Sequence, residues 1–288
     1  MALTTSISVT PFDRRHRPRL DDLLYRSFRV HTHLDWQEAG EWLDTHATPA
    51  RLAWLDGRLV GMLAASEPLN GAAWVRLAAV DDDVAPRPAL EIMWRDLLPD
   101  LTAAGVGTVS ILITRNWIED YIAGLGFAYK EDVVTMQRSG PPPPLPPVSG
   151  LALRPADLSD LERIAAVDHA AFDPPWQLSL PDLRQAQRVA SSSTVAVFDA
   201  AIVGYQISTL YRDGAHLARL AVNPAAQGLG IGGALVTDVI GRFARRGVTG
   251  MTVNTQGGNH RSQRLYRRLG FHHNGYDLPV WSALIAPG

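Results

Sequence analysis

The chain has 288 residues, of which 46% are hydrophobic, and its formal net charge is −2. Because a typical domain has roughly 100–200 residues, this length predicts two compact units. The nearly balanced charge argues against nucleic acid as a partner. The sequence contains no cysteine, which excludes disulfides, thiolate metal sites and a cysteine nucleophile. It has no apolar run typical of a signal peptide or a membrane span, so we expect a cytoplasmic protein without a membrane partner.

A proline-rich segment divides the chain into two halves of similar length. Residues 139–150 include six prolines, and proline lacks the amide donor that helices and paired strands need. The segment is therefore expected to be a stiff spacer. It predicts a first domain at 1–138 and a second domain at 151–288.

The two halves look like copies of one another. Four pairs of identical residues are separated by 144 positions: Pro11 and Pro155, Asp13 and Asp157, Phe28 and Phe172, Gly126 and Gly270. This constant register favours an internal duplication. The copies differ in charge, since residues 1–139 carry a net charge of −5 and residues 140–288 a net charge of +3. A polyanionic ligand would therefore be better received by the second copy.

The second half begins with a pattern of one strand, two helices and three strands. Leu151–Arg154 alternates like a strand, and a capping box of Ser159 and Glu162 predicts a helix that ends at Ala171. Another helix is expected after Ser179. An antiparallel meander of three strands follows: Thr194–Phe198, Ile202–Tyr211 and Ala215–Val222.

After the meander the pattern becomes helix, strand, helix and strands. Leu235, Val239 and Phe243 recur at helical spacing before a stop at Gly247. The next elements are a strand at Met251–Thr255, a helix from a cap at Asn259 to Gly270, and a final strand pair from Phe271 onward.

The loop between the last meander strand and the following helix is rich in glycine. It comprises seven residues: Gln227, Gly228, Leu229, Gly230, Ile231, Gly232 and Gly233. Free amides and the positive end of the helix dipole make such a loop a site for an anion such as a pyrophosphate. The loop also satisfies G-x-G-x-x-G, the dinucleotide-binding pattern of oxidoreductases. A spacer precedes the glycines, and no carboxylate occurs between Asp238 and Asp277 to bind a ribose, so both observations disfavour that alternative. A purely structural glycine turn remains the other alternative.

Two stretches resemble the signatures of the GNAT N-acetyltransferase superfamily. Arg219–Leu235 resembles the acetyl-CoA signature V-x-P-x-x-Q-x-x-G-x-G-x-x-L, and Asn259–Phe271 resembles the downstream signature N-x-x-[SA]-x-x-L-Y-x-x-x-G-F. Phe172–Trp176 is similar to the acceptor-side loop of the branch that acetylates ribosomal-protein N-termini, and the tandem layout is similar to mycothiol synthase. The resemblance implies an α/β (α+β) fold of two tandem GNAT-type domains. Each would have a mixed, mostly antiparallel central sheet flanked by helices.

The resemblance also implies a reaction, in which an acetyl group moves from acetyl-CoA, the co-substrate, to a primary amine by direct attack. The acceptor would be a small molecule or a protein N-terminus. A backbone amide near Val222 would meet the oxyanion, and Tyr266 would be the catalytic acid that protonates the thiolate. The residues implied to contact acetyl-CoA are Leu220, Ala221, Val222, Gln227, Gly228, Leu229, Gly230, Ile231, Gly232, Gly233, Asn259 and Ser262.

The pattern departs from the relatives at the general base. Relatives that acetylate protein N-termini have a glutamate where this chain has Asn254, and asparagine cannot accept a proton. His216 or Asp173 could end a water chain, but we assign no base and no metal. A non-catalytic acyl-CoA-binding sensor therefore stays open as an alternative, as does a homodimer.

The first copy is expected to be a degenerate GNAT-like domain. After Leu77–Val80 it has three carboxylates and two prolines where the second copy has its glycine loop: Asp81, Asp82, Asp83, Pro86 and Pro88. Like charge repels a pyrophosphate, and proline removes donor amides. Ile122 stands in register with Tyr266, so the acid is missing as well.

Overall fold

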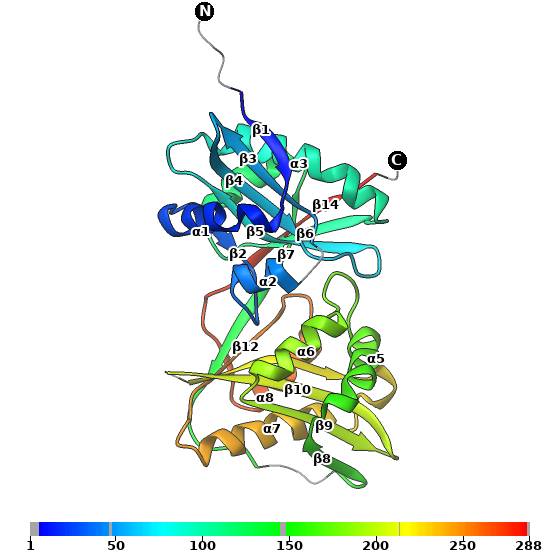
Figure 1. The fold of residues 1–288 in the computed structure, drawn as a ribbon. Coiled ribbons are helices and arrows are strands. Elements are labelled where there is room, and N and C mark those ends of the chain that lie inside the picture. Colours follow the sequence, from blue (N-terminus) through cyan, green and yellow to red (C-terminus); the bar gives the residue numbers. More distant parts are fainter. Residues whose placement is uncertain (1–5, 46–47, 145–147, 213, 287–288) are drawn as a thin grey trace, which may run out of the picture. The chain divides into compact units, whose positions relative to one another are not determined.

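The chain folds into two compact units, each with a mostly antiparallel sheet flanked by helices (Figure 1). This computed structural model describes residues 6–45, 48–144, 148–212 and 214–286, so residues 145–147 of the predicted spacer lie outside the described part. One unit comprises Met1–Lys130 with Pro279–Gly288, and the other comprises Glu131–Leu278. Among the helices that the structure describes, none is long and apolar enough to cross a membrane.

The first unit is built on a sheet with the strand order β1-β3-β4-β5-β6-β14. All pairs in it are antiparallel except β5 with β6, which are parallel. Its elements are β1 (Ser8–Pro11), η1 (Arg14–His16), α1 (Arg17–Arg26), β2 (Val30–Thr32), α2 (Ala39–Thr45), β3 (Ala50–Leu55), β4 (Arg58–Ala65), β5 (Ala72–Val80), α3 (Pro86–Ala103), β6 (Thr108–Leu112), α4 (Asn116–Ile122), η2 (Ala123–Leu125) and β14 (Leu278–Leu284).

Helices cover both faces of this first sheet. Met93 and Leu97 of α3 pack on one face with Leu63 of β4, while Leu20 of α1 packs on the other face with Met62. Successive side chains of a strand point to opposite faces. A strand covered on both faces needs apolar side chains at nearly every position, which accounts for the apolar sequence of β4 after Arg58.

The second unit has the strand order β7-β12-β11-β10-β9-β8, and β13 also pairs with β7. Among the described strands of this unit, β11 and β12 pair in parallel and the other neighbours in this order pair antiparallel. The predicted meander is confirmed as β9, β10 and β11. The elements are β7 (Ala128–Arg138), β8 (Leu151–Pro155), η3 (Leu158–Asp160), α5 (Leu161–Ala171), α6 (Leu180–Val189), β9 (Ser192–Phe198), β10 (Ala201–Tyr211), β11 (Gly214–Val222), η4 (Pro224–Ala226), α7 (Ile231–Ala244), β12 (Met251–Gln256), α8 (His260–Arg268) and β13 (His272–His273).

The start of α5 differs from the predicted capping box. Asp157, not Ser159, caps η3, the 3-10 turn that leads directly into α5: its side chain accepts from the Ser159 amide at 2.9 Å, and Asp160 accepts from the Asp157 amide at 2.8 Å. Arg154 helps to hold Asp160 in this position, because its guanidinium donates to both oxygens of the Asp160 carboxylate at 2.6 and 2.8 Å. The box therefore also ties the helix start to β8.

The two strands expected from Phe271 onward are present as β13 and β14, but they pair with different strands and β14 lies almost wholly in the other unit. β13 pairs with β7, where His272 lies opposite Gln137, whereas β14 pairs with β6, where Val280 lies opposite Leu112. Residues 131–138 thus belong to the second unit and residues 279–288 to the first. The linear boundaries 138 and 151 do not coincide with the units. Two copies of one fold offer the same strand position, and sequence periodicity alone does not tell which copy fills it.

The predicted duplication is visible as a repeated order of elements with repeated local chemistry. Asp13 accepts from an amide two residues ahead, at 2.9 Å, as Asp157 does in the second copy. Gly126 and Gly270 both have left-handed backbone, with φ of 90° and 85°. Each ends the helical segment that follows the parallel strand, a position that glycine occupies without a Cβ clash.

Candidate active site

One edge of β11 is open where the predicted acetyl-CoA segment lies. The Asn223 amide donates to the Val203 carbonyl of β10 at 2.8 Å. Because peptide groups of a strand alternate between its two edges, those of Leu220 and Val222 point away from β10. On that side β12 pairs with β11 only as far as Leu217. In the described part of the chain, the rest of this edge has no strand partner.

The glycine loop presents backbone amides beside this open edge. Gly230, with φ of 85°, is the cap of α7, and no side chain caps the helix. The first intrahelical bond runs from the Ala234 amide to the Gly230 carbonyl at 3.0 Å. The amides of Ile231, Gly232 and Gly233 are therefore the unsatisfied donors of a helix start, where the dipole favours an anion.

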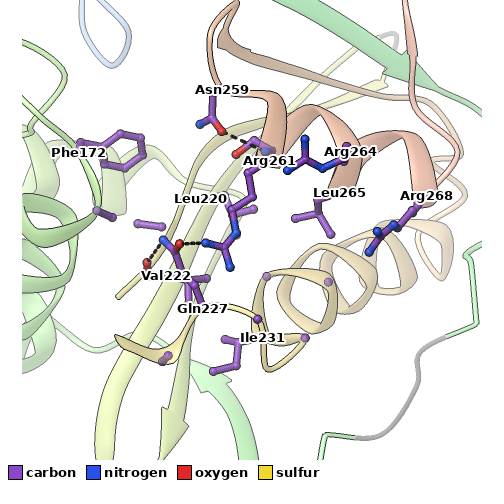
Figure 2. A pocket seen from close by; sticks show the side chains of 18 residues that line it. Phe172, Leu220, Val222, Gln227, Ile231, Asn259, Arg261, Arg264, Leu265 and Arg268 are labelled. Carbon is purple, nitrogen blue, oxygen red and sulfur yellow. Dashed lines mark hydrogen bonds between the residues drawn. The ribbon is translucent and has the colours of Figure 1, made fainter. Parts of the chain in front are cut away.

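A cavity of about 550 Å³ joins the open edge to the glycine loop (Figure 2). Every residue predicted to contact acetyl-CoA lines this cavity except Leu229, which is 48% exposed. The lining includes no aspartate or glutamate. No group of three or more potential metal ligands occurs anywhere in the described residues. The lining residues are Ala171, Phe172, Leu220, Ala221, Val222, Ala226, Gln227, Gly228, Gly230, Ile231, Gly232, Gly233, Asn259, Arg261, Ser262, Arg264, Leu265 and Arg268.

Gln227 fixes the shape of the loop with both ends of its side-chain amide. Its Nε2 donates to the Val222 carbonyl at 2.9 Å, and its Oε1 accepts from Arg261 Nη1. These bonds connect the end of β11 to α8. Since Gln227 occupies the Val222 carbonyl, the Val222 N–H is the group of that residue that stays at the open edge.

Two of the loop glycines also allow close helix packing. A Cβ on Gly232 would lie 3.3 Å from Leu265 Cδ2, and one on Gly233 would lie 3.8 Å from Leu265 Cδ1. The first distance is tighter than an ordinary contact, so the small residue lets α8 rest against the first turn of α7. Glycine here serves packing in addition to the exposed amides.

Asn259 and Ser262 meet at the start of α8. The Asn259 side chain accepts from the Ser262 amide at 3.0 Å, so the predicted helix cap is confirmed. Both residues also line the cavity. The cap therefore holds the helix end at the cavity wall.

Tyr266, the predicted acid, is like Leu229 absent from the residues that line the cavity. Its side chain is only 4% exposed and packs in an apolar cluster, with its ring 5.6 Å from that of Phe271. Burial raises the pKa of Tyr266 above its ordinary value, which keeps the phenol protonated. Its assignment as the acid stays a prediction.

The candidate bases, His216 and Asp173, lie on β11 and in the acceptor-side loop, and Asn254, which replaces the relatives' glutamate, lies on β12. His216 Nδ1 lies 2.8 Å from Thr252 Oγ1 across the β11–β12 pair, and Asn254 is exposed two residues further along β12. In the acceptor-side loop, the backbone carbonyl of Asp173 accepts from the Trp176 amide at 2.9 Å. These contacts single out none of them as the base.

A buried charged network holds the acceptor-side loop against the sheet. Asp168 of α5 is fully buried and accepts from Tyr205 Oη at 2.5 Å, from the Leu178 amide at 2.8 Å and from Arg219 Nε at 2.8 Å. Arg219 also donates to the Trp176 carbonyl at 2.6 Å, and its guanidinium lies 3.7 Å from the centre of the Phe172 ring. This network fixes Phe172 where it lines the cavity.

Sequence reasoning missed the basic wall of the cavity. Arg261, Arg264 and Arg268 line it, and their spacing of three and four residues places them on one face of α8. That spacing is visible in the sequence, and charge periodicity along the predicted helix was the signal. Phe172 was noted only as part of the acceptor-side loop.

The first copy lacks the corresponding groove because its own chain occupies it. β2 pairs with the outer edge of β5, with His31 opposite Ala78, just beyond the part of β5 that pairs with β6. The His33 amide donates to the Arg76 carbonyl at 2.9 Å, and the Val80 amide donates to the Arg29 carbonyl at 3.0 Å. These backbone groups are therefore satisfied within the first unit.

Comparison with known proteins agrees with this geometry. The model of the acetyltransferase (GNAT) family matches residues 161–271, which contain the open edge, the glycine loop and α8. The chain is 32% identical over 154 residues to a mycothiol acetyltransferase of Brachybacterium faecium. That match covers 49% of this chain and 46% of the relative, so it spans about half the length of the curated protein.

Solved structures resemble the chain over nearly its whole length. A tandem GNAT protein from the clavulanic acid biosynthesis pathway has a TM-score of 0.64 at 16% identity, with 98% of this chain and 100% of that chain covered. A GCN5-related N-acetyltransferase from Sphaerobacter thermophilus has a TM-score of 0.61 at 18% identity, with 98% and 96% covered. At these identities the likeness shows the fold. Residues 161–271 thus match the model of the acetyltransferase (GNAT) family, in a chain that has the fold of a tandem GNAT protein.

Proposed function

We propose that this protein transfers an acetyl group from acetyl-CoA to a primary amine, and that the second unit alone binds the co-substrate. The open edge of β11 next to the glycine loop supports this most directly. Leu220 and Val222 offer backbone groups to an amide-bearing chain, and the α7 start offers amides to a diphosphate. A lining without carboxylates suits a polyanion.

The proposed reaction needs few side chains, because backbone groups and the thioester itself supply most of the chemistry. Acetyl-CoA supplies an activated carbonyl, and the neutral amine attacks it while the carbon–sulfur bond breaks. The Val222 N–H, at the open edge, stabilises negative charge on the carbonyl oxygen. Tyr266 gives its proton to the departing thiolate, a role that its raised pKa permits at neutral pH. The proton that the attacking nitrogen loses passes to water, and water reprotonates Tyr266. Its hydroxyl must gain access to the end of the cavity for this step.

The acceptor is a small molecule or a peptide with a free N-terminus. The acceptor-side loop, which Arg219 holds through the Trp176 carbonyl, bounds the amine side of the site. A mycothiol acetyltransferase is among the relatives, so an amine connected with mycothiol belongs in any acceptor panel. No nucleic acid or membrane partner is proposed.

Release of free thiol from acetyl-CoA tests the proposal, measured against a panel of small amines and N-terminal peptides. We expect turnover with at least one amine and none without an acceptor. Tyr266→Phe should lower kcat, whereas Tyr211→Phe, a change at an exposed tyrosine of β10, should not. Tight acetyl-CoA binding without turnover on the whole panel would instead favour the acyl-CoA sensor.

A further inference from the structure

A second cavity lies in the first unit, which has no glycine loop. Its volume is about 690 Å³, within the range of about 300–1,000 Å³ that small-molecule sites occupy. It is formed by β1, β3, the turn η1 and the start of α1 (Figure 1). The polar and aromatic side chains that line it include Thr10, Asp13, Arg15, His16, Arg19 and Trp54.

The second copy fills the equivalent corner with an ion pair of its own. Arg154 and Asp160, which hold the start of α5 to β8, stand 144 positions after Thr10 and His16. A threonine and a histidine cannot form that bidentate pair. The first copy therefore keeps the repeated turn but has lost the ion pair that closes the corner in the second copy.

The polar groups freed by this change gather around Trp54, whose place in the strand register of the second copy belongs to Val197. The indole Nε1 donates to Thr10 Oγ1 at 2.9 Å, so the hydrogen of the Thr10 hydroxyl is available to a ligand. The Arg19 guanidinium lies 5.5 Å from the indole centre and forms no ion pair or hydrogen bond with the described residues.

His16 adds a further donor to the same indole. Its ring meets that of Trp54 edge-on, with 5.3 Å between the ring centres. In the part of the chain that the structure describes, its buried Nδ1 has no hydrogen-bond partner. Nε2 is the ring nitrogen left to meet a ligand. A guanidinium, a hydroxyl and an imidazole thus surround one indole, which is a set of donors suited to an anion with an apolar body.

The charge of the lining limits that anion to a single negative charge. Asp13 and Arg15 offset one another, with Nε 3.5 Å from Oδ1, so Arg19 leaves the lining with a net charge of +1 when His16 is neutral. A carboxylate matches this charge and accepts two hydrogen bonds from one guanidinium. A phosphate monoester, with a charge of about −1.5 to −2, would leave negative charge uncompensated beside Asp13.

We propose that this cavity is a binding site for a small aromatic monocarboxylate. The carboxylate binds Arg19, and the ring packs against Trp54. The site belongs to the unit that is not assigned acyl transfer, so it goes beyond the proposed function and does not depend on it.

Calorimetric titration of the full chain with benzoate, 4-hydroxybenzoate and indole-3-acetate tests the site. At least one of these should bind with a dissociation constant of about 0.1–1 mM, and saturating coenzyme A should change that affinity by less than about twofold. The neutral amide of the same ligand should bind about tenfold more weakly, because it loses the charge-assisted hydrogen bonds. Phenyl phosphate should bind no more tightly than benzoate, and sodium chloride should weaken carboxylate binding.

Arg19→Gln removes the charge and should weaken carboxylate binding about tenfold. Arg163→Gln is the matched control, since it makes the same change 144 positions later, at the exposed equivalent residue of the second copy. It should leave the affinity unchanged. Thermal unfolding of both variants checks that they fold, which is expected because both side chains are exposed.

Four results would overturn the site. They are the absence of binding by all three carboxylates at millimolar concentration, displacement of the carboxylate by coenzyme A, tighter binding of phenyl phosphate than of benzoate, and equal losses in the Arg19 and Arg163 variants. None of them bears on whether the second unit transfers acetyl groups, which the thiol-release assay measures separately.

Discussion

Replacing Asp168 by asparagine should strongly destabilise the second unit. Asp168 is fully buried and is the counter-charge of Arg219, to which its Oδ2 lies 2.6–2.8 Å away. The asparagine keeps the shape but loses the charge, and its NH₂ group cannot accept from Tyr205 or Arg219. Removing one partner of a buried ion pair costs about 3–5 kcal/mol, because the other charge stays buried and uncompensated. We expect a loss of that size in the free energy of unfolding.

Hydrogen exchange of β10 and β11 peptides in urea measures this loss, because a chain with two units need not unfold in one step. Asp238→Asn is the control, since it breaks a pair with Arg242 on the surface of α7 that is worth about 0.3–0.5 kcal/mol. Asp168→Asn combined with Arg219→Gln should cost less than the sum of the single changes. Should Asp168→Asn cost no more than Asp238→Asn, the argument that this network holds the loop fails.

Three further outcomes follow from the geometry. Native mass spectrometry should show one coenzyme A per chain, and a second equivalent would contradict the closed edge of β5. Gly230→Ala should cost about 1–3 kcal/mol of backbone strain and weaken coenzyme A binding. Gly247→Ala, at φ of 82° and away from the cavity, should cost only the strain. Equal coenzyme A affinities in the two variants would refute the role of the Gly230 turn. Burial lowers the pKa of His31 from 6.5 to about 4, so its contribution to stability is complete above pH 6.5 and is lost as the pH falls toward 4, by about 2 kcal/mol at pH 5. Urea titrations from pH 7.5 to pH 5 should show a smaller loss in His31→Gln, and an unchanged loss would show that His31 is not responsible.

The parts of the site that short-range chemistry defines could be predicted from the sequence. The glycine loop, the cap at Asn259 and the stop at Gly270 each depend on residues within one turn of a helix, and all three lie where the pattern places them. The alternation of β11 likewise identifies Leu220 and Val222 as residues of the open edge. Local rules suffice here because backbone amides and left-handed turns make the site.

The parts that depend on distant partners could not be predicted in the same way. Arg219 and Asp168 are 51 positions apart, and no pattern near either residue in the sequence indicates that the two side chains pair. The exchange of β7 and β14 is a choice between two nearly equivalent strand positions. Tyr266 matches its motif, yet the packing of α8 buries it beside Phe271, because a motif specifies a residue's position on a helix and not the access of its side chain.

The contrast between the copies explains how one fold gives one open groove and one closed groove. In both copies an arginine of the strand before the loop donates to a carbonyl beyond the first helix, Arg76 to His33 at 3.0 Å and Arg219 to Trp176 at 2.6 Å. In the first copy the residues just before His33 form β2, which pairs with the β5 edge. In the second copy, a separation of 144 positions puts Pro174 and Pro175 in register with Val30 and His31. Since proline has no amide to donate, this segment cannot form the same ladder, and the edge of β11 is left for a ligand.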